Sequence, residues 1–121
     1  MAHLAITLDC HDPQALASFW SAALGYRVVG GMGQYVALVP GDDHRFGAGP
    51  RLLLQQVPEP KTGKNRLHLD LDLDPGEPLE PEVARLVALG AVEGPVTEEF
   101  GLRWSTLADP EGNEFCVVSR P

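Results

Sequence analysis

The sequence contains an internal repeat, and this repeat limits the folds open to the chain more than any other feature. The segment 3–9 (HLAITLD) is similar to the segment 68–74 (HLDLDLD), 65 residues further on. Ala23-Leu24-Gly25 recurs as Ala88-Leu89-Gly90 at the same offset. Two matches at one spacing indicate duplication of a structural unit rather than chance. We therefore expect two modules with the same order of helices and strands.

The first half of the chain predicts one helix among several short strands. Asp12-Pro13 is typical of a helix start, because Asp caps free N–H groups and Pro fits the first turn. Gly25 predicts the helix end. The helix buries one stripe, namely Leu16, Phe19, Trp20, Ala23 and Leu24. Strands are expected at 3–9, 26–29, 34–39 and 51–57, with 30–33 (GGMG) as a hairpin turn.

The second half repeats this order. Strict alternation predicts a strand at 66–73, and a helix is expected at 81–89 with Val83, Leu86 and Val87 facing inward. Further strands are expected at 102–108 and 114–119, with a weaker one at 91–96. The segment 58–65 (PEPKTGKN) reads as a linker. The sequence thus predicts one α+β domain of two βαβββ modules, 1–57 and 66–121.

The charge balance limits the classes of partner that the chain is expected to bind. Nine Lys and Arg against seventeen Asp and Glu give a net charge of −8. This disfavours nucleic acids and anionic membranes, which are bound through basic residues. No run of apolar residues is long enough to span a bilayer. We expect a cytoplasmic protein, because no segment is typical of a signal peptide and the two cysteines, Cys10 and Cys116, form no CxxC pair.

Three motifs resemble the vicinal oxygen chelate superfamily, which includes glyoxalase I, bleomycin-resistance proteins, extradiol dioxygenases and fosfomycin-resistance enzymes. They are the helix segment 12–26, the segment 67–70 (LHLD) and the turn 109–113 (DPEGN). The resemblance implies a small glyoxalase-like domain whose two cupped sheets form a barrel-like cleft. It also implies a homodimer, and whether one chain or two chains form the cleft stays open.

The same resemblance implies four metal-ligand positions, of which the sequence keeps one. They fall at Ala5, at His68, at Gln55 or Gln56, and at Cys116. Ala5 has no donor atom, Gln is a weak ligand, and Cys binds as a thiolate to soft or borderline metals. His3 would reach the site only if its strand slipped by two residues. We therefore expect no intact metal site of this family.

Alternation places His68, Asp70 and Asp72 on one face of their strand. This pattern fits either a simple wet face or a functional cleft. Trp104 reads either as a ligand-stacking ring or as core. His11 and His44 are expected on surface loops, and Cys10 as an inert buried thiol.

These residues favour a protein that binds a small organic molecule without an essential metal cofactor. The predicted cleft residues are His68, Asp70, Gln55, Trp104 and Cys116. One alternative is a divalent-metal-dependent lyase, isomerase or dioxygenase centred on His68, with Asp70 or Glu114 as base. A second alternative is an interaction domain with a vestigial cleft.

Overall fold

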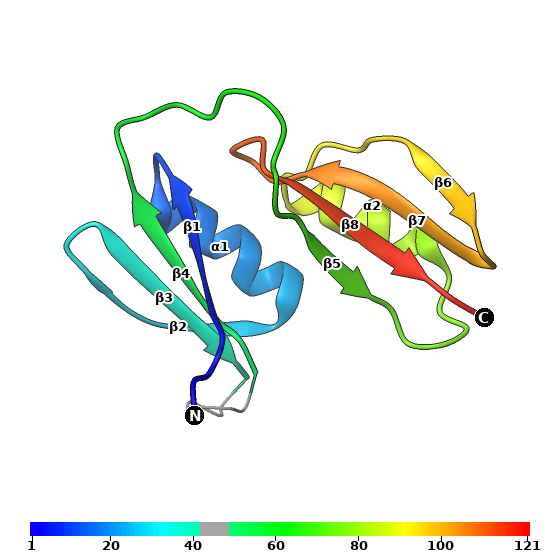
Figure 1. Ribbon diagram of the computed structural model, residues 1–121, viewed down its shortest axis with the longest axis horizontal. Helices are drawn as coiled ribbons and strands as arrows, with labels where there is room; N and C mark the ends of the chain where they lie inside the picture. The colour runs from blue at the N-terminus through cyan, green and yellow to red at the C-terminus, as the bar shows by residue number, and fades with distance from the viewer. Residues whose placement is uncertain (42–48) are drawn as a thin grey trace. The chain divides into compact units, whose positions relative to one another are not determined.

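The computed structural model describes residues 1–41 and 49–121 (Figure 1). The chain divides into two compact units, Met1–Pro60 and Lys61–Pro121. In each unit one helix packs against a single face of a four-stranded sheet. No helix in the described part of the chain has both the length and the apolar character needed to cross a membrane.

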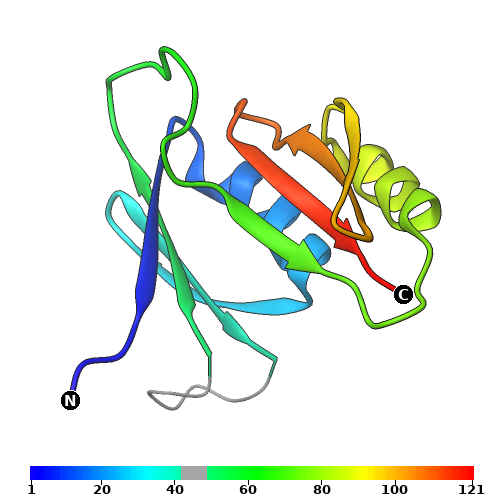
Figure 2. The ribbon, with the colours of Figure 1, turned by 45° about the vertical axis from the view of Figure 1, so that its right-hand side comes forward.

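The first unit consists of β1 (Ala5–Cys10), α1 (Pro13–Leu24), β2 (Tyr26–Met32), β3 (Tyr35–Pro40) and β4 (Arg51–Gln56). Its sheet has the order β1-β4-β3-β2. Strand β1 runs parallel to β4, and the other neighbours are antiparallel. Figure 2 shows β1 and β4 side by side, although the helix and two strands separate them in the sequence.

The second unit consists of β5 (Leu69–Asp72), α2 (Leu79–Leu89), β6 (Val96–Glu99), β7 (Leu102–Ala108) and β8 (Glu114–Ser119). Its sheet has the order β5-β8-β7-β6, with β5 parallel to β8. This is the order of the first unit, so the predicted duplication and the α+β class are confirmed. Each sheet is open. Its edge strands are β1 and β2 in the first unit and β5 and β6 in the second unit.

Helix α1 begins and ends where the sequence predicts. The Asp12 carboxylate accepts a hydrogen bond from the Ala15 N–H at 3.2 Å, and Pro13 occupies the first turn. The helix ends at Gly25, whose φ of 69° lies in the left-handed region that glycine adopts without strain. Phe19 and Trp20 are buried as expected, with their rings edge-to-face at 5.1 Å.

Helix α2 starts two residues earlier than expected, at Leu79 rather than Pro81. Leu79, Val83 and Leu86 are buried, while Val87 is 39% exposed. The prediction that Val87 faces inward is therefore wrong. The apolar stripe runs through Leu79, Val83 and Leu86, at i, i+4 and i+7, and this spacing leaves Val87 at its margin.

Three strand predictions need correction. Strand β5 is Leu69–Asp72, so His68 lies just before the strand and not inside it. Strand β6 is Val96–Glu99, so only its first residue falls in the predicted range 91–96, where Val92 also forms an isolated bridge to Ala108. Residues 30–32 belong to β2, which has a bulge between Val28 and Gly30, so the turn falls at 33–34.

The segment 57–68 contains no helix or strand. Pro60 ends the first unit, and the second unit begins with Lys61. Lys61 and Asn65 both contact Glu114 at the start of β8. The later half of the predicted linker 58–65 is thus attached to the second unit.

Candidate functional site

The second sheet has one face free of α2, and most of the predicted site residues lie on it. Phe115, Val117 and Leu107 are buried against the helix, so the alternate positions of β7 and β8 point the other way. Asp70 pairs with Cys116, and Cys116 pairs with Thr106 on its other side. These three residues therefore form one row across the helix-free face of the second sheet.

His68 joins two members of this row. The donor atoms of His68, Asp70 and Cys116 all lie within 4.8 Å of one another. Cys116 is only 9% exposed, and its Sγ lies 3.5 Å from the Thr106 Oγ1. His68 and Asp70 are exposed. An imidazole, a carboxylate and a thiol thus converge, and these groups can bind a metal ion or exchange protons.

Glu114, a predicted candidate base, is engaged elsewhere. Its carboxylate accepts a hydrogen bond from the Asn65 N–H at 2.9 Å and lies 3.5 Å from the Lys61 Nζ. The Asn65 hydrogen bond, helped by the nearby Lys61 charge, lowers the pKa of Glu114. Because a lowered pKa makes a carboxylate a weaker base, Glu114 suits the anchoring of residues 61–65 better than catalysis.

Two further residues of this face have defined neighbours. Trp104 is half-buried and pairs with Val118 on one side and Thr97 on the other. This partial exposure does not decide between the two predictions for Trp104, a core residue or a ring that stacks on a ligand. Asp72 is paired with Arg120, whose Nη2 donates to the Asp72 carboxylate at 2.9 Å.

The structure shows which of the two glutamines of β4 lies on the helix-free face of the first sheet, together with Leu53. Gln56 donates from Nε2 to the His11 carbonyl at 3.1 Å, and Leu54 on the same side of β4 is buried against α1. Gln55 therefore lies on the helix-free face of the first sheet, opposite Tyr35. A role for Gln55 in binding stays a prediction.

Cys10 and His11, in the first unit, each have a backbone carbonyl as neighbour. Cys10 is buried, and its thiol lies 3.6 Å from the Gln55 carbonyl. His11 is exposed, as expected of a loop residue, and its ring nitrogen lies 3.3 Å from the Glu59 carbonyl. His44 lies outside the described residues.

The ligand set implied by the family resemblance does not fit a metal ion. Ala5, at the start of β1, pairs with Arg51 and offers only a methyl group. The exposed His3 precedes the strand, whose register with β4 begins at Ala5. Gln55 is a weak ligand, and Cys116 stands where a carboxylate is expected. These four positions therefore do not supply the ligands of such a centre.

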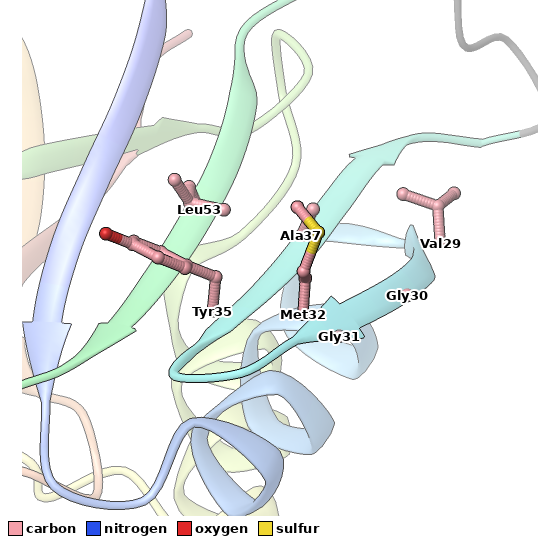
Figure 3. Close-up of a pocket in the computed structure, with 7 residues that line it drawn as sticks. All are labelled: Val29, Gly30, Gly31, Met32, Tyr35, Ala37 and Leu53. Atoms are coloured by element: carbon pink, nitrogen blue, oxygen red, sulfur yellow. The ribbon is translucent and has the colours of Figure 1, made fainter.

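A pocket of about 300 Å³ opens on the helix-free face of the first sheet (Figure 3). Gly30 and Gly31 expose bare backbone, and a Cβ on Gly30 would meet no atom within 4 Å. Side chains of β2, β3 and β4 complete the lining, namely Val29, Met32, Tyr35, Ala37 and Leu53.

Sequence reasoning missed this pocket, because residues 30–33 read as a turn. The signal available was the alternation of Tyr35 and Ala37 with buried Val36 and Leu38. That alternation marks an apolar helix-free face.

Two open βαβββ units with a shared strand order define a protein with the vicinal oxygen chelate fold. The family model described as "Glyoxalase-like domain" matches residues 5–118. The chain therefore belongs to the glyoxalase-like domain family. A search of curated proteins found no match.

Solved structures with the same fold share little sequence with this chain. A glyoxalase/bleomycin resistance protein/dioxygenase family enzyme from Burkholderia phytofirmans has a TM-score of 0.78 at 17% identity, with 97% of each chain covered. A glyoxalase-related enzyme from Fulvimarina pelagi has a TM-score of 0.75 at 20% identity, covering 100% of this chain and 89% of that one.

A variant of the fosfomycin resistance protein FosX from Listeria monocytogenes, complexed with Mn(II) and 1S,2S-dihydroxypropylphosphonic acid, also matches. It has a TM-score of 0.78 at 15% identity, covering 99% of this chain and 90% of that one. At these identities the likeness shows the fold alone.

Proposed function

We propose that this protein binds a small, largely apolar organic molecule on the helix-free face of its first sheet. The observation that carries the proposal is the pocket of about 300 Å³ lined by Val29, Met32, Tyr35, Ala37 and Leu53. Ligand pockets typically begin at about this volume and are lined mainly by apolar and aromatic side chains.

The residues around the pocket suggest what it would hold. The lining is apolar apart from backbone groups and the Tyr35 hydroxyl, and Gln55 is the cross-strand neighbour of Tyr35. Tyr35 offers a ring for stacking together with one hydrogen-bonding group. The net charge of −8 disfavours anionic ligands. A neutral or cationic molecule with an aromatic or branched aliphatic part is the expected ligand.

The metal-dependent alternative has weaker support. A lyase, isomerase or dioxygenase of this family would use ligands from both modules, and Ala5 supplies none. The Mn(II) complex of FosX belongs to a protein only 15% identical to this chain. An interaction domain would not require a pocket lined by exposed backbone glycines. The homodimer and the cytoplasmic location stay predictions.

The proposal is tested by titrating the full chain with N-phenyl-1-naphthylamine, a neutral aromatic dye that fluoresces in apolar surroundings. We expect saturable binding of one dye per chain. Ala37→Phe places a phenyl ring in the pocket and should weaken binding at least about tenfold, or ~1.4 kcal/mol.

Two further variants make the test specific. Ala84→Phe adds the same ring on the exposed surface of α2 and should leave the affinity unchanged. Met32→Asp is a second pocket variant that places a charge on a highly exposed side chain, so the fold should tolerate it. Lack of saturable binding, or equal affinity in the native chain and both pocket variants, would overturn the proposal.

A further inference from the structure

We propose that the pocket on the first sheet takes a cationic ligand, an amine joined to a small apolar group, and that Asp9 determines this preference. The inference rests on the proposed function, because the apolar part of the ligand would occupy the same pocket. It adds the chemical class of the ligand and the residue that recognises its charge. Asp9 itself lies outside the pocket lining.

The strand register of the first sheet places Asp9 in line with the pocket. Asp9 pairs with Gln55 on β4, and Gln55 pairs with Tyr35 on β3. Tyr35 in turn pairs with Met32 on β2. Paired residues of neighbouring strands have their side chains on the same face, so these four residues form a lateral row across the helix-free face. The lateral row carries a carboxylate at its β1 end and pocket residues on β2 and β3.

Asp9 is also close to the pocket along the strand direction. Leu53, which lines the pocket, pairs with Thr7, two residues before Asp9 on β1. Neighbouring strands are about 4.8 Å apart and two residues of a strand rise about 6.6 Å, so the Cα atoms of Asp9 and Leu53 lie roughly 8 Å apart. A short alkyl chain would therefore connect an apolar group in the pocket to an amine beside the Asp9 carboxylate.

Tyr35 lies between the apolar pocket and the carboxylate. Figure 3 shows its ring directed from β3 over β4, with the hydroxyl on the side of β1. The side chain is half-buried, so part of the ring stays open to a ligand. A cation within about 6 Å of an aromatic ring centre is attracted to the face of the ring. An amine between Tyr35 and Asp9 would thus gain a cation–π contact and an ion pair.

The Asp9 carboxylate is available to such a ligand. Asp9 is exposed, and within residues 1–41 and 49–121 no ion pair involves it. A cation would therefore gain a carboxylate without first breaking a salt bridge. The net charge of −8 adds a long-range attraction for cations.

The two arginines of the first sheet, Arg27 and Arg51, lie toward its other end. Arg51 is four residues before Gln55 on β4, which corresponds to roughly 13 Å along the strand. This separation exceeds the Debye length of about 8 Å at physiological ionic strength. The arginines therefore oppose a cation beside Asp9 only weakly.

The competing explanation for Asp9 is a purely structural role. Asp is disfavoured inside strands, but a charge on an edge strand such as β1 hinders pairing with another chain. That role would not depend on the charge of a ligand. The two explanations therefore predict different results for ligands that differ only in charge.

The experiment measures displacement of N-phenyl-1-naphthylamine from the full chain by three compounds that share one phenylpropyl group. At neutral pH, 3-phenylpropylamine is a cation, 3-phenylpropanol is neutral and 3-phenylpropanoate is an anion. We expect the amine to displace the dye at about tenfold lower concentration than the alcohol, because an ion pair and a cation–π contact combine. The anion should be the weakest competitor.

Matched variants identify the group that recognises the charge. Asp9→Asn keeps the shape of the side chain and should reduce the preference for the amine over the alcohol about fivefold, with the affinity for the neutral dye unchanged. Asp9→Glu should retain the preference. Asp74→Asn removes the same charge from an exposed position of the second unit and should leave the preference unchanged, which controls for net charge.

These readouts separate the present inference from the proposed function. If the native chain binds the dye but the amine and the alcohol compete equally, the role of Asp9 is overturned while the pocket stands. The same conclusion follows if Asp9→Asn keeps the full preference for the amine. Absence of saturable dye binding would overturn the proposed function and this inference with it.

Discussion

The turn between β7 and β8 depends on one buried carboxylate, and removing it should cost much of the stability of the second unit. Asp109 is only 1% exposed. Its Oδ1 accepts hydrogen bonds from the Glu111 N–H at 2.9 Å and from the Asn113 N–H at 3.0 Å. The Asn113 side-chain amide lies within 3.1 Å of both carboxylate oxygens. Asp109→Ala would leave all three donors without this acceptor.

The size of the effect follows from these contacts. A hydrogen bond to a charged group contributes about 1.5–3 kcal/mol, so three donors set an upper range of about 4.5–9 kcal/mol. The sum is not reached, because contributions within one network are not additive and water can reach the half-exposed donors. We expect Asp109→Ala to lower the free energy of unfolding by about 3–5 kcal/mol.

Urea unfolding of the full chain, followed by Trp fluorescence, measures this change. The midpoint should fall while the slope stays constant. Asp74→Ala removes an exposed carboxylate and should change stability by less than about 0.5 kcal/mol. If Asp109→Ala cost no more than the Asp74→Ala control, the turn would not depend on this carboxylate.

Three other substitutions test the account. The lowered pKa of Glu114 means that its hydrogen bond from Asn65 stabilises the fold above the usual glutamate pKa and is lost as the pH falls through the lowered value. Glu114→Gln should therefore reduce the loss of stability on acidification, measured by urea unfolding at neutral pH and at about pH 3. An unchanged loss would contradict this. Ser105 is buried, and its hydroxyl lacks a partner among the described residues. Ser105→Ala should be neutral or should raise the melting temperature; a clear fall would reveal a missed partner. A Cβ at Gly94 would collide with the Thr106 carbonyl oxygen, so Gly94→Ala should cost at least about 2 kcal/mol in urea unfolding, and a neutral effect would refute that close approach.

Local signals made the first helix predictable. The cap at Asp12, the proline at position 13, the apolar stripe and Gly25 all lie within one short segment, and each acts through its immediate neighbours. The duplicated strand order was predictable for a related reason, since the two copies of the repeat support each other. Element ends were less predictable where distant residues set them. Strand β5 extends only where it pairs with β8, over Leu69–Asp72, and no pattern near residue 66 encodes that pairing.

The candidate site was only partly predictable. Alternation predicted that His68 and Asp70 share a face, but their approach to Cys116 depends on β5 pairing with the distant β8. The choice between Gln55 and Gln56 needed the register of β4 and the hydrogen bond from Gln56 to the His11 carbonyl. The apolar pocket was missed because paired glycines favour a turn and a bulged strand alike, and only the β2–β3 pairing distinguishes them.

The most direct test of the proposed function is to map the dye-binding site by two-dimensional NMR of the isotope-labelled full chain. Under titration with N-phenyl-1-naphthylamine, we expect the largest amide shifts at Val29, Tyr35 and Leu53, with small shifts in α2. Largest shifts confined to the second unit, or no saturable shift at all, would contradict the assignment of the ligand site to the first sheet.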